Sequence, residues 1–507
     1  MCFCRVCNVN SLYRTKNIDT LLDEAEHGAN RLQRTLGPWT LTAFGVGAVI
    51  GSGIFIITGT AAAGETFHVE SVLHAPIIDL IRHGSAAASL TGRMGAGPGV
   101  ALSFLLTAIV CGFAALCYAE LASMIPIAGS AYTFSYAALG EIIAWIIGWD
   151  LILEYAVSNM AVAVGFSAYL NDSLEGLFGF QIPPQLAGPV FAGGRLTGHW
   201  FNLPAFLIII ILSFVLSRGI RESASTNNAM VVVKVAAIVI FVIGAARAVQ
   251  TQNWHPFMPN GISGVLTGSA IVFFTYIGFD SVSTTAEECK HPQRDLPIGI
   301  ISTLVICASL YIAVALVLTG VADYRTLNNA APVANVLKAL GYDNLRRIVG
   351  LGALFGIVSS LMVYQYGQTR IWFAMSRDGL LPKVFSEVHP RFHTPFVSTW
   401  IAALVVGIPA AIWDIGTFAD LSNIGTLFAF IVVSLGVVVL RKTQPHRPRG
   451  FRVPLAPITP VLAMLACLGL MLALPLATWF RFLIWLALGL LIYAWFGRRH
   501  SKLRWQG

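Results

Sequence analysis

Charged residues are scarce in this chain of 507 residues. They make up 11% of it, whereas roughly a quarter of the residues in soluble domains are charged. Hydrophobic residues make up 56%, and the mean hydropathy is +0.74. This balance excludes an ordinary soluble protein and indicates a chain that crosses a membrane many times.

Several patterns that would mark other functions are missing as well. No GxxxxGK sequence occurs, so a pump driven by nucleotide hydrolysis is disfavoured. The eight cysteines are scattered and predict no disulfide framework. Cys2, Cys4 and Cys7 cluster, but no fourth ligand for zinc lies at a suitable spacing. We therefore expect neither a bound metal nor another cofactor.

The first 37 residues contain no apolar core of the signal-peptide kind, which predicts that the N-terminus stays in the cytoplasm. Apolar residues recur at helical spacing from Ile18 to Leu32. This pattern predicts a short amphipathic helix against the cytoplasmic face, and a plain leader is the alternative.

Twelve apolar stretches are interpreted as membrane spans under the rule that a helix needs about 20 residues to cross a bilayer. The prediction is an all-α polytopic membrane protein. The expected spans lie near residues 38–60, 100–124, 141–170, 202–217, 229–249, 264–287, 298–320, 348–376, 396–413, 421–440, 454–474 and 480–497.

The basic residues predict how the chain is oriented. Twelve spans place both termini on one side, and most Lys and Arg residues between the spans fall on that side, among them Arg441, Lys442 and Arg447. The positive-inside rule therefore predicts cytoplasmic termini. This topology also explains the net charge of +8 without a nucleic-acid partner, since the basic residues occupy short loops rather than one face.

Two of the predicted outer loops are long. The loop at 61–99 contains His68, His74 and His83 with several carboxylates, but their spacing matches no metal motif, so an ordinary solvated loop is favoured. The loop at 171–200 is rich in proline and glycine and predicts irregular chain.

The first span is crowded with glycine. Gly45, Gly47, Gly51 and Gly53 fall within FGVGAVIGSGIF, and each costs roughly 1 kcal/mol against alanine inside a helix. Lipid cannot hydrogen-bond the backbone that a break exposes, so a break must face protein, water or ligand. The N–H groups of Gly51, Ser52 and Gly53 would then form an anion site suited to a carboxylate. The alternative is a close helix contact through Gly47 and Gly51.

The sixth span, GSAIVFFTYIGFDSVSTTAEE, repeats this signal, and its Ile-Gly pair at 277–278 echoes the pair at 50–51. Two interrupted spans, each opening one half of a ten-helix core, predict an inverted-repeat transporter with its site at the midplane. The carbonyls of Phe274, Thr275 and Ile277 would face an ammonium group, so a zwitterion fits the two breaks together. The alternative is that the glycine of the second pair serves only packing.

Three ionisable residues lie inside spans, where such groups are costly and mark functional candidates. Lys234, if it faces the first break, would donate to carbonyls near residues 45–49 in place of a cation, and loss of its proton would release that helix. Alternatively, Lys234 lies about 9 Å from its helix start and could extend its head into water. Asp280 could instead cap the second half of the sixth span, and Glu154 could be a protonated core group. We expect these three residues to be the candidates for proton coupling.

The chain resembles the amino acid, polyamine and organocation transporter superfamily, and within it the bacterial cationic amino acid transporter branch. The resemblance covers roughly residues 12–500. It rests on four motifs in order, GVGAVIGSGIF at 45–55, CYAELASMIPIAGSAYTFSYAALGE at 117–141, FFTYIGFDSVSTTAEECKHPQRDLPIGI at 273–300 and YGQTRIWFAMSRDGLLP at 366–382.

The resemblance implies two inverted five-helix repeats with broken helices 1 and 6, in the inner (plasma) membrane. The cytoplasmic segment at 1–37 would precede a transport core at 38–440, terminal helices at 441–497 and a tail at 498–507. An α-amino acid would lie between the broken helices, with Phe274 closing over it. The substrate-binding residues implied are Ile50, Gly51, Ser52, Gly53, Phe274, Thr275, Ile277, Gly278 and Asn159.

In related permeases a lysine at the position of Lys234 replaces a sodium ion, which implies proton symport. Two departures bear on the site. The loop at 61–99 is much longer than the family pattern, and Ser158-Asn159-Met160 stands where relatives usually carry small residues.

The leading prediction is a secondary active amino acid transporter that works by alternating access and is not an enzyme. A channel would need a continuous polar stripe, and a membrane-embedded enzyme would need clustered histidines or paired carboxylates. A proton-independent exchanger is the alternative among transporters. We expect a broad range of neutral substrates, because Phe273, Phe274, Tyr276 and Met160 would line the pocket with apolar surface.

Overall fold

The computed structural model describes residues 14–19, 22, 36–66, 72–83, 92–127, 129–192, 195–218, 224–329, 331–390, 392 and 394–502. Cys2, Cys4, Cys7 and His68 lie outside the described residues, as does most of the helix predicted between Ile18 and Leu32.

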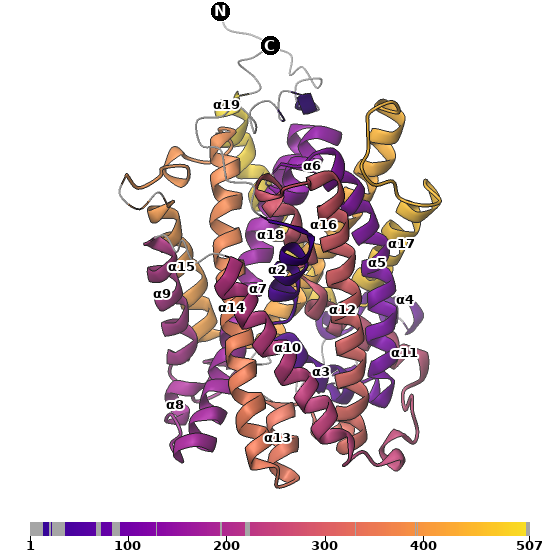
Figure 1. The fold of residues 1–507 in the computed structure, drawn as a ribbon, viewed down its shortest axis with the longest axis vertical. Coiled ribbons are helices and arrows are strands. Elements are labelled where there is room, and N and C mark those ends of the chain that lie inside the picture. The colour runs from indigo at the N-terminus through magenta and orange to yellow at the C-terminus, as the bar shows by residue number, and fades with distance from the viewer. Residues whose placement is uncertain are drawn as a thin grey trace, which may run out of the picture.

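Long helices standing side by side make up nearly all of the described chain (Figure 1). The α-helices are α2 (Pro38–Val49), α3 (Gly53–Ala63), α4 (Ile77–His83), α5 (Val100–Met124), α6 (Ser130–Ala138), α7 (Glu141–Phe178), α8 (Pro184–Ala187), α9 (Leu203–Ser217), α10 (Ala224–Ala246), α11 (Gly261–Val272), α12 (Pro292–Val321), α13 (Pro332–Ala339), α14 (Asp343–Arg377), α15 (Phe396–Ile412), α16 (Ile415–Thr443), α17 (Ile458–Leu472), α18 (Leu476–Ile492) and α19 (Arg498–His500).

Short turns and strands complete the described chain. The 3₁₀ turns are η2 (Val72–His74), η4 (Gly97–Gly99), η5 (Thr251–Trp254), η6 (Phe273–Tyr276), η7 (Phe279–Glu288), η8 (Tyr324–Thr326) and η9 (Lys383–Phe385), and one π turn, η10 (Tyr493–Gly497), extends α18. The strands are β1 (Gly64–Thr66), β2 (Gly92–Met94), β3 (Phe191–Ala192) and β4 (Arg195–Leu196), which form two antiparallel pairs.

The helices match the predicted spans. Among the described residues, eight helices are long and apolar enough to cross a membrane, and the bent pair α2 and α3 can form one more crossing. Three shorter apolar helices, α9, α15 and α17, account for the remaining predicted ranges. The prediction of an all-α polytopic membrane protein is therefore confirmed.

Both predicted interruptions are present. Helices α2 and α3 meet at an angle of 49° across the break between Val49 and Gly53. In the sixth crossing, α11 runs into η6, the chain extends at Ile277, and Gly278 takes a φ of 118° before η7 begins. That left-handed conformation favours glycine, because a Cβ there is strained.

The broken helices lie inside the bundle. Helix α2 packs against α10, α12 and η7, while α3 packs against α11. Long helices flank them, with α5 along α12 and α7 along α14 (Figure 1). The N-terminal and C-terminal described segments meet at one end, where Lys16 Nζ lies 2.7 Å from Asp378 Oδ1 and Lys502 N donates to Asp378 O.

The two long loops are more ordered than the sequence predicts. Helix α7 continues to Phe178, and β3 pairs with β4 within the stretch predicted to be irregular. In the loop at 61–99, β1 pairs with β2, and Arg93 is only 5% exposed, so this loop is not simply solvated. The described residues contain no cluster of three or more His, Cys, Asp and Glu placed to hold a metal.

Candidate functional site

The break in the first helix opens backbone groups in the bundle interior. The amides of Ile50 and Gly51 bond back to the carbonyls of Val46 and Val49. Ser52 and Gly53 begin α3, and the first amides of a helix have no acceptor within it. The Ser52 hydroxyl is fully buried and has no hydrogen-bond partner among the described residues. This geometry suits a ligand that accepts hydrogen bonds.

The second break lies directly against the first. A Cβ added at Gly53 would lie 2.9 Å from Thr275 Cγ2 and 3.3 Å from Phe274 Cδ1. A Cβ at Gly278 would lie 3.1 Å from the carbonyl carbon of Ala48. Glycine is therefore needed at both contacts, and segments more than 200 residues apart in sequence form one centre. Gly278 therefore packs closely against Ala48 of α2.

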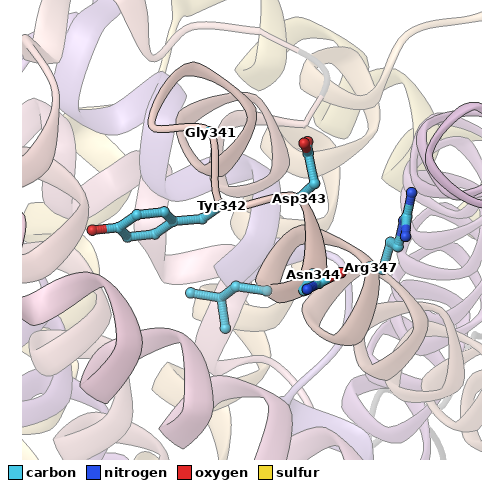
Figure 2. A pocket seen from close by; sticks show the side chains of 6 residues that line it. Gly341, Tyr342, Asp343, Asn344 and Arg347 are labelled. Carbon is cyan, nitrogen blue, oxygen red and sulfur yellow. The ribbon is translucent and has the colours of Figure 1, made fainter.

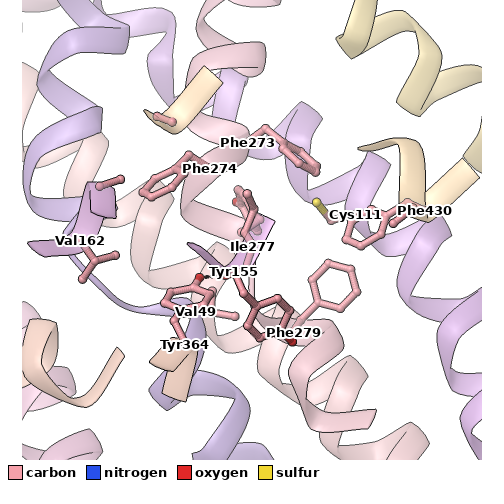
Figure 3. Packing of buried hydrophobic residues seen from close by; sticks show 14 of the residues in the cluster. Val49, Cys111, Tyr155, Val162, Phe273, Phe274, Ile277, Phe279, Tyr364 and Phe430 are labelled. Carbon is pink, nitrogen blue, oxygen red and sulfur yellow. Dashed lines mark hydrogen bonds between the residues drawn. The ribbon is translucent and has the colours of Figure 1, made fainter. Parts of the chain in front are cut away.

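Two tyrosines that the sequence analysis did not single out bind carbonyls at the breaks. The Tyr311 hydroxyl lies 2.8 Å from Thr275 O and 3.0 Å from Val49 O, so it spans both broken helices. The Tyr364 hydroxyl donates to Ile277 O at 3.1 Å. Figure 3 shows Tyr364 beside Val49 and Ile277. Hydroxyl groups inside apolar helices were the available signal, but sequence alone does not say where they point.

Lys234 on α10 reaches the first break. Its Nζ lies 2.6 Å from Gly47 O, 2.7 Å from Ile50 O and 2.8 Å from Ser359 Oγ. The residue is 0% exposed, so its head does not extend into water. Three donors meeting three oxygens satisfy an ammonium group completely.

A second residue of α14 reinforces the same two carbonyls. Ser360 Oγ lies 3.0 Å from Gly47 O and 3.1 Å from Ile50 O. The break in helix 1 is thus held from α10 and α14 together, through oxygens that the helix itself leaves free.

Asn159 bonds a side chain of a neighbouring helix through its Nδ2, while its Oδ1 is buried without a partner among the described residues. Its Nδ2 donates to Gln365 Oε1 at 2.5 Å, and Gln365 Nε2 donates to Ser213 Oγ, so Asn159 belongs to a polar contact among α7, α14 and α9. The face of α7 that meets the break carries Val162, which approaches Gly51, and Gly165, which approaches Ser52. Ser158 shares that face by helical spacing and bonds Ser422 at 2.6 Å.

The predicted carboxylates lie together on the other side of the second break. Asp280 and Glu154 are each 2% exposed and interact electrostatically with one another. The Asp280 carboxylate meets the backbone amides of Gly278, Asp280 and Ser281, while η7 follows its N-cap Gly278 without a capping side chain. Asp150, which the sequence analysis did not single out, is fully buried beside Glu154. Glu154 Oε2 and both Asp150 oxygens have no partner among the described residues, which makes them candidate proton-binding groups.

Only part of the expected aromatic lining faces the break. Phe274 lies at Gly53, whereas the Phe273 ring points the other way and packs on Phe430 at 5.9 Å (Figure 3). Tyr276 is turned toward α5, where its hydroxyl bonds Phe104 O at 2.9 Å. The predicted lining by Phe273 and Tyr276 is therefore not found.

A separate hollow lies where α13 leads into α14 (Figure 2). It is lined by Gly341, Tyr342, Asp343, Asn344, Leu345 and Arg347. Ser359, which touches Lys234, is twelve residues further along α14 than Arg347, or about 18 Å at the helical rise. The hollow therefore does not belong to the site between the breaks.

Comparison with known proteins assigns the chain to a family. The family model described as amino acid permease matches residues 36–493, nearly the whole chain. The chain belongs to the amino acid permease family. The resemblance seen in the sequence is thereby confirmed, and this permease is not an enzyme.

Three relatives show what this permease is similar to. It is 45% identical, over 98% of its length and all of the relative, to the methylthioribose transporter of Bacillus subtilis (strain 168). It is 44% identical, over 97% of its length and 99% of the relative, to the branched-chain amino acid permease BcaP of the same bacterium. The chloroplastic cationic amino acid transporter 9 of Arabidopsis thaliana is 36% identical over 81% of this permease and 67% of the relative. The first two relatives are thus more similar to the chain than this member of the cationic branch.

Proposed function

We propose that this protein is a proton-coupled secondary active permease for neutral amino acids, above all branched-chain ones. The observation that carries this proposal is the contact of the Lys234 ammonium with Gly47 O and Ile50 O in the first break. A buried cation there takes the place that a transported metal cation would occupy in a sodium-driven transporter.

The two breaks supply complementary halves of an amino acid site. Amides of Ser52 and Gly53 at the start of α3 bind the carboxylate, where the helix dipole also favours negative charge, whereas the Gly51 amide is engaged by Val49 O. The carbonyls of Thr275 and Ile277 accept from the ammonium group, because a carbonyl bound by a tyrosine keeps a second lone pair.

Neutral substrates follow from the surroundings of the breaks. A cationic side chain needs an anionic partner, yet the Asp280 carboxylate is engaged by amides of its own turn. Phe274 adds an apolar surface at Gly53. The name of the relative BcaP, a branched-chain amino acid permease, supports the same substrate class.

Proton coupling follows from the hydrogen bond and the charge that Lys234 would lose on deprotonation. The charged Lys234 donates three hydrogen bonds and ties α2 and α3 to α10 and α14. Loss of the proton removes one donor and the charge, so the broken helix is held less tightly. The two repeats then rock about the site, and the inward and outward states differ in lysine charge. Glu154, Asp280 and Asp150 are candidates to exchange protons on the other side of the second break.

The orientation proposed from the sequence is retained. The end of the bundle that carries residues 14–19 and 498–502 faces the cytoplasm of a cell whose inner membrane holds the permease. The basic residues Arg441, Arg447 and Arg449 lie near that end, as the positive-inside rule requires.

Uptake into proteoliposomes tests the coupling. An inward proton gradient should drive accumulation of leucine well above the external concentration, because each cycle carries a proton with the substrate. Equal internal and external leucine concentrations at every proton gradient would contradict proton coupling and favour proton-independent exchange.

A competition panel tests the substrate class. We expect unlabelled leucine, isoleucine and valine to displace labelled leucine at least tenfold more effectively than arginine does, because the Asp280 carboxylate at the second break is engaged by backbone amides. Alanine and methylthioribose belong in the same panel. Displacement by arginine alone would contradict the proposal, and displacement by methylthioribose alone would assign the site to that sugar derivative.

A further inference from the structure

A buried ion triad joins the long loop at 61–99 to the transport core. Arg93 Nη1 lies 2.8 Å from Asp420 Oδ1, and Arg93 Nε lies 2.6 Å from Glu65 Oε2. Arg93 Nη2 also contacts Glu65. The Arg93 side chain is 3% exposed, and those of Glu65 and Asp420 are 17% and 12% exposed.

The triad connects elements that belong to different parts of the bundle. Glu65 on β1 faces Arg93 on β2. Glu65 lies two residues beyond the end of α3. Asp420 lies in the second turn of α16, whose start is capped by Asp414. Helix α3 is the half-helix whose other end carries Ser52 and Gly53. A movement of α3 at the site must therefore move Arg93 relative to Asp420.

The charges resist separation while they are buried. Burial disfavours the charged guanidinium, but Asp420 and Glu65 outweigh it and raise the pKa of Arg93. Burial also raises the pKa of Glu65, against the effect of Arg93. Removing one partner from a buried ion pair leaves an uncompensated charge, so the contact opens only if water enters. Such a contact has two discrete states rather than a range of intermediate ones.

We propose that the bond between Arg93 and Asp420 is the outer latch of this permease, closed while the site is shut to the outside and broken when substrate enters. This rests on the proposed alternating access and orientation, which place the triad at the outer end. The loop at 61–99 thus supplies a gating residue, Arg93, to a core whose helices are those of the family.

The two carboxylates of the triad connect different elements. The bond between Arg93 and Glu65 lies within the β1 and β2 pair and stabilises the two ends of the loop at 61–99. The bond to Asp420 crosses from that pair to α16. If the triad only stabilised the fold, Glu65 and Asp420 would be equivalent. If the bond is the latch, Asp420 is the residue that controls access to the site from outside.

Thiol labelling measures access without any transport assay. Cysteine is placed at the first break by Ser52→Cys, and a membrane-impermeant maleimide is added outside oriented vesicles. The protein with Ser52 intact gives the background from its own cysteines. In the Ser52→Cys protein we expect Asp420→Asn to raise the initial labelling rate on the order of tenfold, within the range usual for coupling between sites. We expect Glu65→Gln to change the rate less than twofold.

The control is Asp323→Asn, the same change at an exposed carboxylate whose nearest guanidinium, on Arg325, is 3.9 Å away. It should leave labelling unchanged. Arg93→Lys is a second variant, which keeps the buried positive charge and the fold. A lysine ammonium cannot bond both carboxylates as the planar guanidinium does, so the labelling rate should rise. Thermal unfolding of each variant shows that the fold persists.

Unchanged labelling in both Asp420→Asn and Arg93→Lys would overturn the latch, as would equal rises for Asp420→Asn and Glu65→Gln. The labelling result does not depend on the identity of the substrate. If the latch hypothesis fails, labelling does not change but leucine is still taken up. If the proposed function fails, labelling rises but leucine is not transported, so the two failures are distinguishable.

Discussion

Lys234→Ala is expected to abolish proton-driven accumulation while leaving some amino acid exchange. The change removes three hydrogen bonds that tie the first break to α10 and α14. It also removes the titratable group, so substrate binding should lose its dependence on pH. Net uptake and exchange of labelled leucine, each measured in proteoliposomes at external pH 5 to 8, separate the two effects.

Lys338→Ala is the matched control for this experiment. Lys338 is a half-exposed lysine on α13 that pairs with Glu175 at 2.9 Å and touches neither break. It should accumulate substrate with the pH profile of the unchanged protein. The same outcome in Lys234→Ala would show that Lys234 only anchors the helix.

Gly53→Leu is expected to lower substrate affinity by at least 100-fold. The Cβ alone would lie 2.9 Å from Thr275 Cγ2, so a leucine either fills the space between the breaks or pushes them apart. Gly51→Leu should act in the same direction, since its Cβ would lie 3.1 Å from Ser360 Oγ. Ser52→Ala should be milder because it keeps the backbone amide. Equilibrium binding of labelled leucine to purified protein measures all three.

Gly469→Leu on α17 is the matched glycine control, because no atom of the described residues lies within 4 Å of its added Cβ. It should bind substrate normally. Leucine amide, which lacks the carboxylate, tests the chemistry directly and should bind the unchanged protein far more weakly than leucine. Comparable affinity for leucine and its amide would contradict the assignment of the α3 amides to the carboxylate.

The local sequence determined the spans and their interruptions. Membrane thickness fixes the length of an apolar helix, so runs of apolar residues predict spans such as α5, found at the predicted bounds of 100–124. Glycine and polar residues inside such runs predict breaks, because lipid leaves an opened backbone unsatisfied. Lys234 stood out for the same reason, as a charge within a bilayer.

Tertiary structure decided which groups meet. Asn159 and Ser158 are neighbours in sequence, yet α7 turns Asn159 toward Gln365 and Ser158 toward Ser422. Tyr311 joins Val49 to Thr275, and Arg93 joins Asp420 over 327 positions of sequence. Helical periodicity fixes a side chain's direction only relative to its own helix, and the rotation of each helix in the bundle is set by packing against all of its neighbours. The presence of polar groups in the membrane was therefore readable from the sequence, whereas their partners depended on contacts between helices far apart in the chain.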